Sequence, residues 1–312
     1  MISASAPGKL LLSGEYAVLR GAPAIVAAVD ARAVATLDPS AAGDPPQPEA
    51  REARKEAERR FGPAPGRLAI DVAALRSEDK KLGLGSSAAA AAAAAGVVAL
   101  AHGRDLRDEG VRREVFEAAF EGHRIVAPQG SGVDVAASAL GGYVRFVRRG
   151  DGAEATAVSL PEGLFLEVVW TGKEARTSDF LAKVEALRAR DAEAHARAFE
   201  RLLREADTLA DAFARGDAHA VVEGAEAYGA AMEALGVASG APIVEETLSA
   251  IRTIAAGCGG SAKPSGAGGG DVAVAFFTDL TSVKKFRSRC EAGRFTLLPL
   301  RLGAEGVRSG AR

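Results

Sequence analysis

The 312-residue sequence is poor in cysteine, histidine and aromatic residues, and it carries almost no net charge. Its two cysteines, Cys258 and Cys290, belong to no CxxC motif or Cys/His cluster, so neither a disulfide framework nor a zinc site is expected. The 39 basic and 41 acidic residues give a net charge of −2, without the positive field that nucleic-acid binding requires. The sequence therefore predicts no nucleic-acid partner and a reducing, cytoplasmic environment.

Long hydrophobic runs are missing as well. The N-terminal segment has no basic region followed by a long apolar run, so no signal peptide is expected. The longest apolar run starts at Ala88 and is mostly alanine, which is too weakly hydrophobic to predict a membrane span. With 48% hydrophobic and 26% charged residues, the chain has an ordinary globular composition and is long enough for one large or two medium domains.

Short apolar segments and longer helical segments alternate along the chain, which predicts an α+β fold with a boundary near residues 149–155. Strands are expected within residues 9–37 and over residues 67–75, 141–147, 164–172, 272–279 and 295–302. Helices are expected over residues 49–60, 87–102, 108–126, 177–235 and 281–293.

A glycine pair precedes the alanine-rich helix in the segment "GLGSSA". Gly83 and Gly85 allow unusual backbone dihedrals and a close approach of a ligand, and Ser86 or Ser87 can cap the helix. Because the N–H groups and the dipole at a helix N-terminus attract anions, the segment predicts a phosphate site with a serine hydroxyl available for Mg²⁺. It is not a P-loop, because GxxxxGK[ST] does not occur. Taken alone, it also fits an ordinary glycine turn before a capped helix.

Two further segments contain glycine turns. "KPSGAGGGD" at residues 263–271 has four glycines in five positions and runs directly into the apolar segment "VAVAFF". Successive N–H groups in such a loop can bind an anion, whereas a flexible linker would not usually end in a strand. "APGKLLLSGEYAV" at residues 6–18 places Lys9 at the start of an expected strand and Gly14-Glu15 in its turn. A single lysine in that position is more often solvated surface.

In this order and spacing, the three segments resemble the motifs of the GHMP kinases, the family of galactokinase, homoserine kinase, mevalonate kinase and phosphomevalonate kinase. The resemblance extends over nearly the whole chain. It implies a two-domain GHMP kinase fold with a ribosomal S5-like N-terminal domain, residues 1–152, and a ferredoxin-like C-terminal domain, residues 153–312. ATP would lie between these domains.

Other segments are similar to the phosphomevalonate kinase branch of the family. These are "QGSGVDVAASALGGYVRF" at residues 129–146 and "VVWTGKEARTSDFLAKV" at residues 168–184, with Arg176 where that branch usually has serine. Motif one has Tyr16 where mevalonate kinases and galactokinases often have histidine. Mevalonate kinases also place a Mg²⁺-binding glutamate eleven residues before the catalytic aspartate, where this chain has His123, with Glu121 two residues away.

The resemblance implies ATP and Mg²⁺ as cofactors and assigns Lys9 and Asp134 to catalysis. The residues alone favour an Asx turn or a helix cap at Asp134 over a catalytic role. The implied nucleotide-binding residues are Gly83, Leu84, Gly85, Ser86, Ser87 and Ala88, of which Ser86 and Ser87 would also hold the metal. The implied substrate-binding residues are Lys9, Tyr16, Ser131, Gly132, Asp134, Lys173, Arg176, Thr177, Ser265, Gly266, Ala267 and Gly268.

The leading hypothesis for the reaction is the phosphorylation of 5-phosphomevalonate to 5-diphosphomevalonate. A phosphate monoester is mostly dianionic at pH 7, so its main obstacle is repulsion from ATP rather than deprotonation. Cations near the acceptor counter that repulsion, and Lys9, Lys173, Arg176 and Lys263 all lie in or beside the predicted loops.

Two alternatives remain. One is mevalonate kinase or another small-molecule alcohol kinase of the family. The other belongs to a different class, a catalytically silent binding protein of the same fold, although Lys9, the paired serines, Asp134 and the third glycine loop are all intact. In every case the expected partner is a small molecule, with no nucleic acid and no membrane, and the protein is expected to be a monomer or a homodimer.

Overall fold

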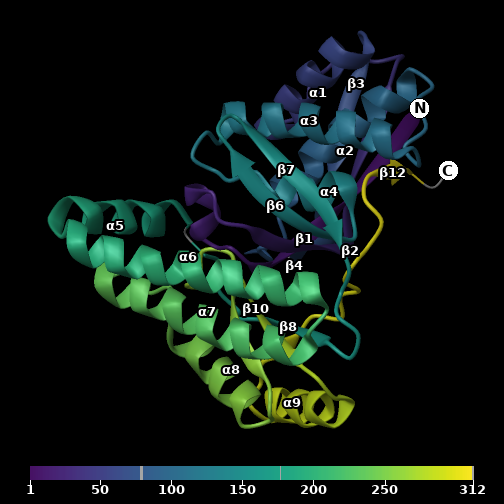
Figure 1. Ribbon diagram of the computed structural model, residues 1–312. Helices are drawn as coiled ribbons and strands as arrows, with labels where there is room; N and C mark the ends of the chain where they lie inside the picture. Colours follow the sequence, from purple (N-terminus) through teal and green to yellow (C-terminus); the bar gives the residue numbers. More distant parts are fainter. Residues whose placement is uncertain (78–79, 176, 311–312) are drawn as a thin grey trace. The chain divides into compact units, whose positions relative to one another are not determined.

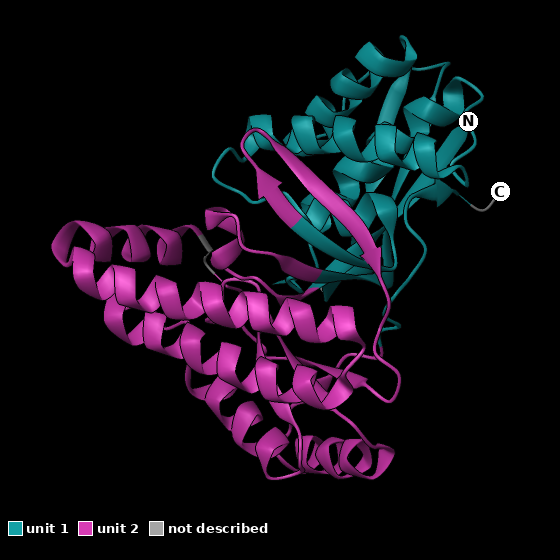
Figure 2. Ribbon diagram, viewed as in Figure 1, with its two compact units in different colours: residues 1–10, 26–146, 300–312 teal, residues 11–25, 147–299 magenta. Residues whose placement is uncertain are grey.

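The computed structural model describes residues 1–77, 80–175 and 177–310 and separates the chain into two compact units (Figure 2). The first unit consists of residues 1–10, 26–146 and 300–312, and the second consists of residues 11–25 and 147–299. Relative to the predicted domains, residues 11–25 are grouped with the later half of the chain and residues 300–312 with the earlier half. The division into domains 1–152 and 153–312 stays a prediction.

The first unit is built on a sheet in which strands lie in the order β12-β1-β2-β6, while β3 pairs with β2 (Figure 1). These strands are β1 (Ile2–Ser13), β2 (Ala24–Asp38), β3 (Arg67–Asp71), β6 (Tyr143–Arg149) and β12 (Arg308–Ser309), and several extend into residues of the second unit. The helices are α1 (Pro48–Phe61), α2 (Ser86–Ala101), α3 (Glu109–Val126) and α4 (Val133–Leu140). A short hairpin of β4 (Arg76–Ser77) and β5 (Lys80–Lys81) follows the 3₁₀ turn η2 (Ala73–Leu75).

The alanine-rich helix α2 is the centre of this unit and contacts α1, α3 and α4. All eight residues from Ala88 to Ala95 are buried. Alanine has the highest helix propensity and loses no side-chain entropy, so the segment forms a helix and lets neighbouring elements approach closely. The same close packing is visible at Gly96, where a Cβ would lie 2.5 Å from a methyl group of Val307.

The second unit contains an antiparallel sheet in the order β11-β8-β10-β9. Its strands are β8 (Phe165–Trp170), β9 (Ser261–Ser265), β10 (Val272–Phe277) and β11 (Thr296–Leu297), and β7 (Gly152–Val158) pairs with the end of β6. The remaining elements are η1 (Ala17–Arg20), α5 (Thr177–Arg190), α6 (Ala192–Arg215), α7 (Ala218–Ser239), α8 (Glu246–Ala256) and α9 (Leu280–Ala292). Strand β10 is buried along its whole length, with Val272 opposite Ser265 and Trp170.

The α+β composition and most of the predicted elements are confirmed, but two segments differ. Residues 67–75 form a strand only as far as Asp71, after which the chain turns into η2. Residues 295–302 form only the two-residue strand β11, and Pro299, which has no N–H, lies two residues after its end. The helical pattern predicted over residues 177–235 is confirmed, and it consists of three helices because Asp191 and Asp217 each accept a hydrogen bond as the N-cap of a new one.

Among the described residues, no helix is long and apolar enough to cross a membrane.

Candidate functional site

Lys9 and Asp134 form an ion pair in the first unit. The Nζ atom of Lys9 lies 3.5 Å from Oδ2 of Asp134, and the Lys9 side chain is only 8% exposed. Lys9 lies in the interior of β1, not at its start as predicted, and its N–H donates to the Leu84 carbonyl at 2.9 Å. The structure therefore brings the motif-one lysine, the glycine segment before α2 and Asp134 to one place.

Gly85 places this lysine against the N-terminus of α2. Gly85 has φ +74°, and a Cβ on it would lie 2.7 Å from Cγ of Lys9, so a larger residue would collide with the lysine side chain. The prediction of a serine cap is wrong, because Gly85 is the N-cap and no side chain caps the helix. Ser86 and Ser87 are instead the first two helical residues, and both are partly exposed.

The first turn of α2 offers an anion site. The first intrahelical hydrogen bond runs from the Ala89 N–H to the Gly85 carbonyl, so the N–H groups of Ser86, Ser87 and Ala88 precede it. The positive end of a 16-residue helix dipole points in the same direction. A phosphate group fits this arrangement because it accepts several N–H donors without needing a side chain between them.

The N-terminus of α4 positions Asp134, which lies in the first turn of that helix. Gly132 is the N-cap of α4 with φ +78°, and a Cβ there would lie 2.2 Å from the Phe120 ring. The Val133 N–H donates to Oγ of Ser131 at 3.3 Å, so Ser131 and Gly132 shape the turn before the helix. Asp134 is in the first turn rather than at the cap, where the helix dipole favours its negative charge. Its carboxylate is therefore available to Lys9.

The third glycine loop is in the second unit and follows β9. The φ angles of Gly266, Gly268, Gly269, Gly270 and Asp271 are all positive, between 54° and 159°. A Cβ on Gly268 would lie 2.2 Å from a backbone carbonyl oxygen, and a Cβ on Gly269 would lie 2.2 Å from the Phe180 ring. The loop therefore needs glycine both for its dihedrals and for its packing.

Asp271 joins this loop to the segment that follows β8. Its N–H donates to the Lys173 carbonyl at 2.7 Å, its carbonyl accepts the Thr171 N–H at 2.9 Å, and its Oδ1 accepts the Ala175 N–H at 3.0 Å. The predicted substrate residue Lys173 is thereby brought next to the third loop. Its side chain is 61% exposed, and Nζ lies 3.0 Å from a carboxylate oxygen of Glu245.

Tyr16 and Ser265, both predicted substrate residues, are buried and bonded to backbone. The Tyr16 hydroxyl donates to the Ala267 carbonyl at 2.5 Å, and Oγ of Ser265 accepts the Leu11 N–H at 2.9 Å. Burial, with a smaller effect of the Glu15 carboxylate, raises the pKa of Tyr16 above its ordinary value of 10, so the hydroxyl stays protonated as a donor. Arg176 lies outside the described residues, and Thr177 is the first residue of α5.

Lys263 is not the exposed cation that its neighbourhood in the sequence suggested. Its side chain is 0% exposed, its ammonium pairs with the buried carboxylate of Glu15, and it also donates to the Pro264 carbonyl at 2.7 Å. Residues 263–265 belong to β9 rather than to the glycine loop. Because the Lys263 ammonium is fully enclosed and bonded to Glu15 and to two backbone carbonyls, Lys263 is removed from the cations that favoured a phosphorylated acceptor.

Metal ligands from the chain are sparse. Within residues 1–77, 80–175 and 177–310, no group of three or more His, Cys, Asp or Glu residues could hold a metal ion. The carboxylate of Glu121 accepts from Arg60 of α1 at 2.8 Å, so this residue is engaged in packing α1 against α3. A metal at this site would depend on phosphate oxygens together with few protein ligands.

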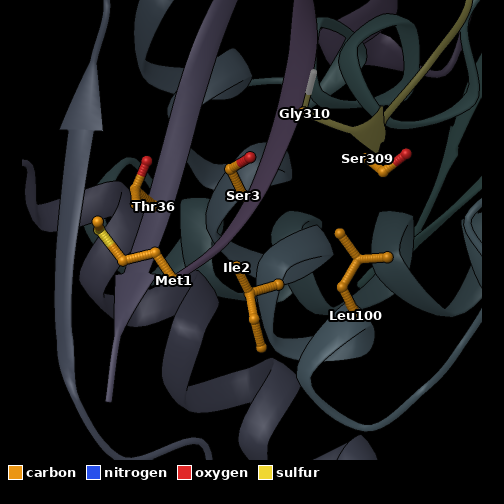
Figure 3. Close-up of a pocket in the computed structure, with 7 residues that line it drawn as sticks. All are labelled: Met1, Ile2, Ser3, Thr36, Leu100, Ser309 and Gly310. Atoms are coloured by element: carbon orange, nitrogen blue, oxygen red, sulfur yellow. The ribbon is translucent and has the colours of Figure 1, made fainter. Parts of the chain in front are cut away.

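A hollow of about 430 Å³ also opens in the first unit (Figure 3). It is lined by Met1, Ile2, Ser3, Thr36, Leu100, Ser309 and Gly310. Ser3 precedes Lys9 by six residues on the same strand, which separates them by about 20 Å at about 3.3 Å per residue. The hollow is therefore distinct from the Lys9–Asp134 site, and none of its lining side chains is charged.

Comparison with known proteins identifies the family of this chain. The GHMP kinases N terminal domain matches residues 50–142. A phosphomevalonate kinase from Streptomyces sp. (strain CL190) is 30% identical, with 97% of each chain covered. The chain belongs to the GHMP kinase family. A mevalonate kinase from Aeropyrum pernix is 32% identical to this GHMP kinase, with 88% of each chain covered.

Solved structures show the same fold. Phosphomevalonate kinase from Streptococcus pneumoniae, in complex with phosphomevalonate and AMPPNP, matches with a TM-score of 0.82 at 21% identity, covering 97% of this chain and 100% of that one. The Lin0012 protein from Listeria innocua matches with a TM-score of 0.87 at 22% identity, covering 99% and 100%. The predicted two-domain GHMP kinase fold is confirmed. This GHMP kinase is a phosphotransferase, as predicted, and family membership implies ATP as the donor.

Proposed function

We propose that this GHMP kinase transfers the γ-phosphoryl group of ATP to the phosphate of 5-phosphomevalonate, giving 5-diphosphomevalonate and ADP. The observation that carries the chemistry is the buried Lys9 ammonium, held against Asp134 and beside the open first turn of α2. The choice of acceptor is supported by the 30% identity to a phosphomevalonate kinase over 97% of the chain.

The N-terminus of α2 binds the phosphates of ATP in this proposal. Residues 83–88 supply the backbone, and the missing Cβ at Gly85 leaves the space that Lys9 uses. Ser86 and Ser87 would hold Mg²⁺, which would supply positive charge to offset that of the ATP phosphates. Lys9 then stabilises the negative charge on the transferring group from a position with little access to water.

Asp134 has two tasks that depend on the acceptor. A phosphate acceptor is already ionised, so Asp134 mainly orients Lys9 through their ion pair. A hydroxyl acceptor must lose a proton, and the same carboxylate would then accept it. Tyr16, Ser131, Gly132, Lys173, Arg176, Thr177 and residues 265–268 are proposed to contribute to acceptor binding. Among the cations named for this role, Lys9, Lys173 and Arg176 remain after the correction of Lys263.

Mevalonate kinase is the alternative with specific support. Mevalonate kinases from Aeropyrum pernix and Thermococcus sibiricus are 32% and 31% identical to the chain, the second over 59% of its length. The burial of Lys263 also weakens the argument from positive charge. Against this alternative, the position where mevalonate kinases carry a Mg²⁺-binding glutamate is His123 in this sequence.

The deciding experiment is ADP release from the purified protein with Mg²⁺ and ATP, run in parallel with mevalonate and with 5-phosphomevalonate. We expect a higher kcat/KM with 5-phosphomevalonate and loss of turnover with both acceptors in Lys9→Met. Preferential turnover of mevalonate would contradict the proposed acceptor and leave the kinase chemistry in place. If neither acceptor causes ADP release at saturating ATP, the proposal as a whole is contradicted.

A further inference from the structure

The second unit contains a buried ion pair that the proposed chemistry does not use. The side chains of Lys263 and Glu15 are 0% and 1% exposed. The Lys263 ammonium also donates to the carbonyls of Leu11, at 3.5 Å, and Pro264, at 2.7 Å. Two charges removed from water are unfavourable unless they are paired and hydrogen-bonded, and apolar residues of similar volume are often as stable. General stability is therefore a poor explanation for the pair.

The pair lies between motif one and the third glycine loop. Oε1 of Glu15 accepts the Gly266 N–H at 3.4 Å as well as the Lys263 ammonium. Bonds from the Leu11 N–H to Ser265 and from the Tyr16 hydroxyl to Ala267 join the same two segments. We call this set of contacts, made by Leu11, Glu15, Tyr16, Lys263, Ser265, Gly266 and Ala267, the loop clasp.

The first residue of the glycine loop is bonded to the buried carboxylate. Gly266 has φ +98°, and no atom lies within 4 Å of the position that a Cβ would take. Its N–H donates to Oε1 of Glu15 at 3.4 Å, which ties the start of the loop to motif one. The N–H groups of Ala267 and Gly268, which follow, make no backbone hydrogen bond within the described part of the chain. They are the groups that the loop can present to an anion.

We propose that Glu15 and Lys263 are positioning residues, which fix Gly266 through the loop clasp so that the N–H groups of Ala267 and Gly268 face the phosphate of the acceptor. This inference rests on the proposed function, in which residues 265–268 bind the acceptor. Neither residue touches substrate. Lys263 compensates the charge of Glu15, and Glu15 supplies the oxygen that holds the loop.

A third residue, from outside the motifs, holds the backbone of Glu15. The hydroxyl of Tyr228, in α7, donates to the backbone carbonyl of Glu15 at 2.7 Å, and its ring lies 5.8 Å from the Lys263 ammonium. Tyr228 is itself fully buried, and burial together with the Glu15 charge raises its pKa well above 10. It therefore remains a donor at any physiological pH, and its contact orients Glu15 without adding to the charge of the clasp.

Two double variants separate positioning from stability. E15Q/K263M and E15M/K263M both remove the two charges together, so neither leaves an unpaired buried ion. Glutamine retains an oxygen that can accept the Gly266 N–H, whereas methionine has none. We expect the KM for 5-phosphomevalonate to be about tenfold higher in E15M/K263M than in E15Q/K263M, the factor that corresponds to one lost hydrogen bond. The KM for ATP is expected to differ less than twofold.

Thermal unfolding of both variants shows whether they are folded. The amide hydrogen-exchange rates of residues 266–270 show how firmly the loop clasp holds the loop, and they are measured without any substrate. We expect exchange there to be about tenfold faster in E15M/K263M than in E15Q/K263M, with similar rates in β8. Equal exchange and an equal acceptor KM in the two variants would overturn the inference. If the wild-type protein turned over neither acceptor, the exchange result would still test the clasp, because it does not depend on the reaction.

If E15M/K263M does not fold, Tyr228→Phe provides a milder test. This variant keeps both charges and removes only the hydroxyl that holds the Glu15 backbone. We expect a two- to threefold increase in the acceptor KM with kcat within twofold of wild type. An unchanged acceptor KM together with unchanged exchange at residues 266–270 would overturn the inference by this route.

Discussion

Replacing Gly85 with alanine should displace Lys9, the proposed catalytic lysine, while leaving every charged group in the protein intact. The added Cβ would lie 2.7 Å from Cγ and 3.1 Å from Cε of Lys9. Contacts under 3.0 Å between carbon atoms do not persist, so one side must move. Because Cγ is near the backbone of the lysine, the whole ammonium stem has to swing away from Asp134.

Two effects of different size follow. The φ angle of +74° at Gly85 is unfavourable for alanine, which destabilises the fold by about 1–2 kcal/mol. Misplacing the Lys9 ammonium should lower kcat by about 10²- to 10³-fold, the range found when one preorganised donor is removed from a transition state. The loss of activity therefore exceeds what the loss of stability explains.

Gly103 offers a matched control at the other end of α2. Its φ is +70°, and no atom lies within 4 Å of the Cβ that alanine would add. Gly103→Ala should therefore carry the same backbone strain without touching Lys9. The assay is ADP release at saturating ATP and acceptor, with urea unfolding of each variant. A kcat for Gly85→Ala within twofold of that for Gly103→Ala would refute the assignment of Lys9 and the packing argument together.

Three further predictions concern single side chains. Asp134→Asn should reduce turnover of a hydroxyl acceptor by about 10²- to 10⁴-fold and that of a phosphate acceptor by less; equal losses in the ADP-release assay would contradict a role as base. Ser87→Ala should raise the Mg²⁺ concentration needed for half-maximal rate more than Ser86→Ala does. Identical Mg²⁺ titrations for Ser87→Ala and the wild-type protein would argue against metal binding by Ser87. Burial raises the pKa of Glu245, but hydrogen bonds from Lys173 and two backbone N–H groups outweigh it and hold that pKa below 4.5. The stabilisation by Glu245 should thus be complete above pH 4.5 and disappear as the pH falls through its folded pKa, so the difference in melting temperature between wild type and Glu245→Gln should shrink over that window.

Local sequence signals were sufficient for most elements of the fold. The alanine run from Ala88 fixes α2 by propensity, and Asp108, where a helix was predicted to begin, is the N-cap of α3. Boundaries failed where tertiary context competes with propensity. The apolar residues after Asp71 form a 3₁₀ turn, and the C-terminal apolar segment pairs over only two residues.

The candidate site was predictable in part for the same reason. Glycines at positions 83, 85 and 132 have positive φ angles that a sequence pattern can anticipate, and they mark the turns before α2 and α4. The cap itself was misassigned, because a serine beside glycine is a stronger statistical signal than the left-handed glycine that ends the turn. Tyr228 could not be found at all, since a tyrosine in an alanine-rich helix has no distinguishing pattern.

By itself, the sequence determined which residues form the glycine turns and the alanine-rich helix, because dihedral preference and helix propensity are properties of a few neighbouring residues. It also named Lys9 and Asp134 as candidate catalytic residues, through the motifs that contain them. Only the tertiary structure decided what surrounds each charge. Lys9 and Lys263 look alike as lysines near glycine loops, yet one approaches Asp134 at the N-terminus of a helix and the other is buried against a carboxylate 248 residues away. Whether a charge can meet a ligand depends on its burial and its partner, and both are set by contacts that no local stretch of sequence contains.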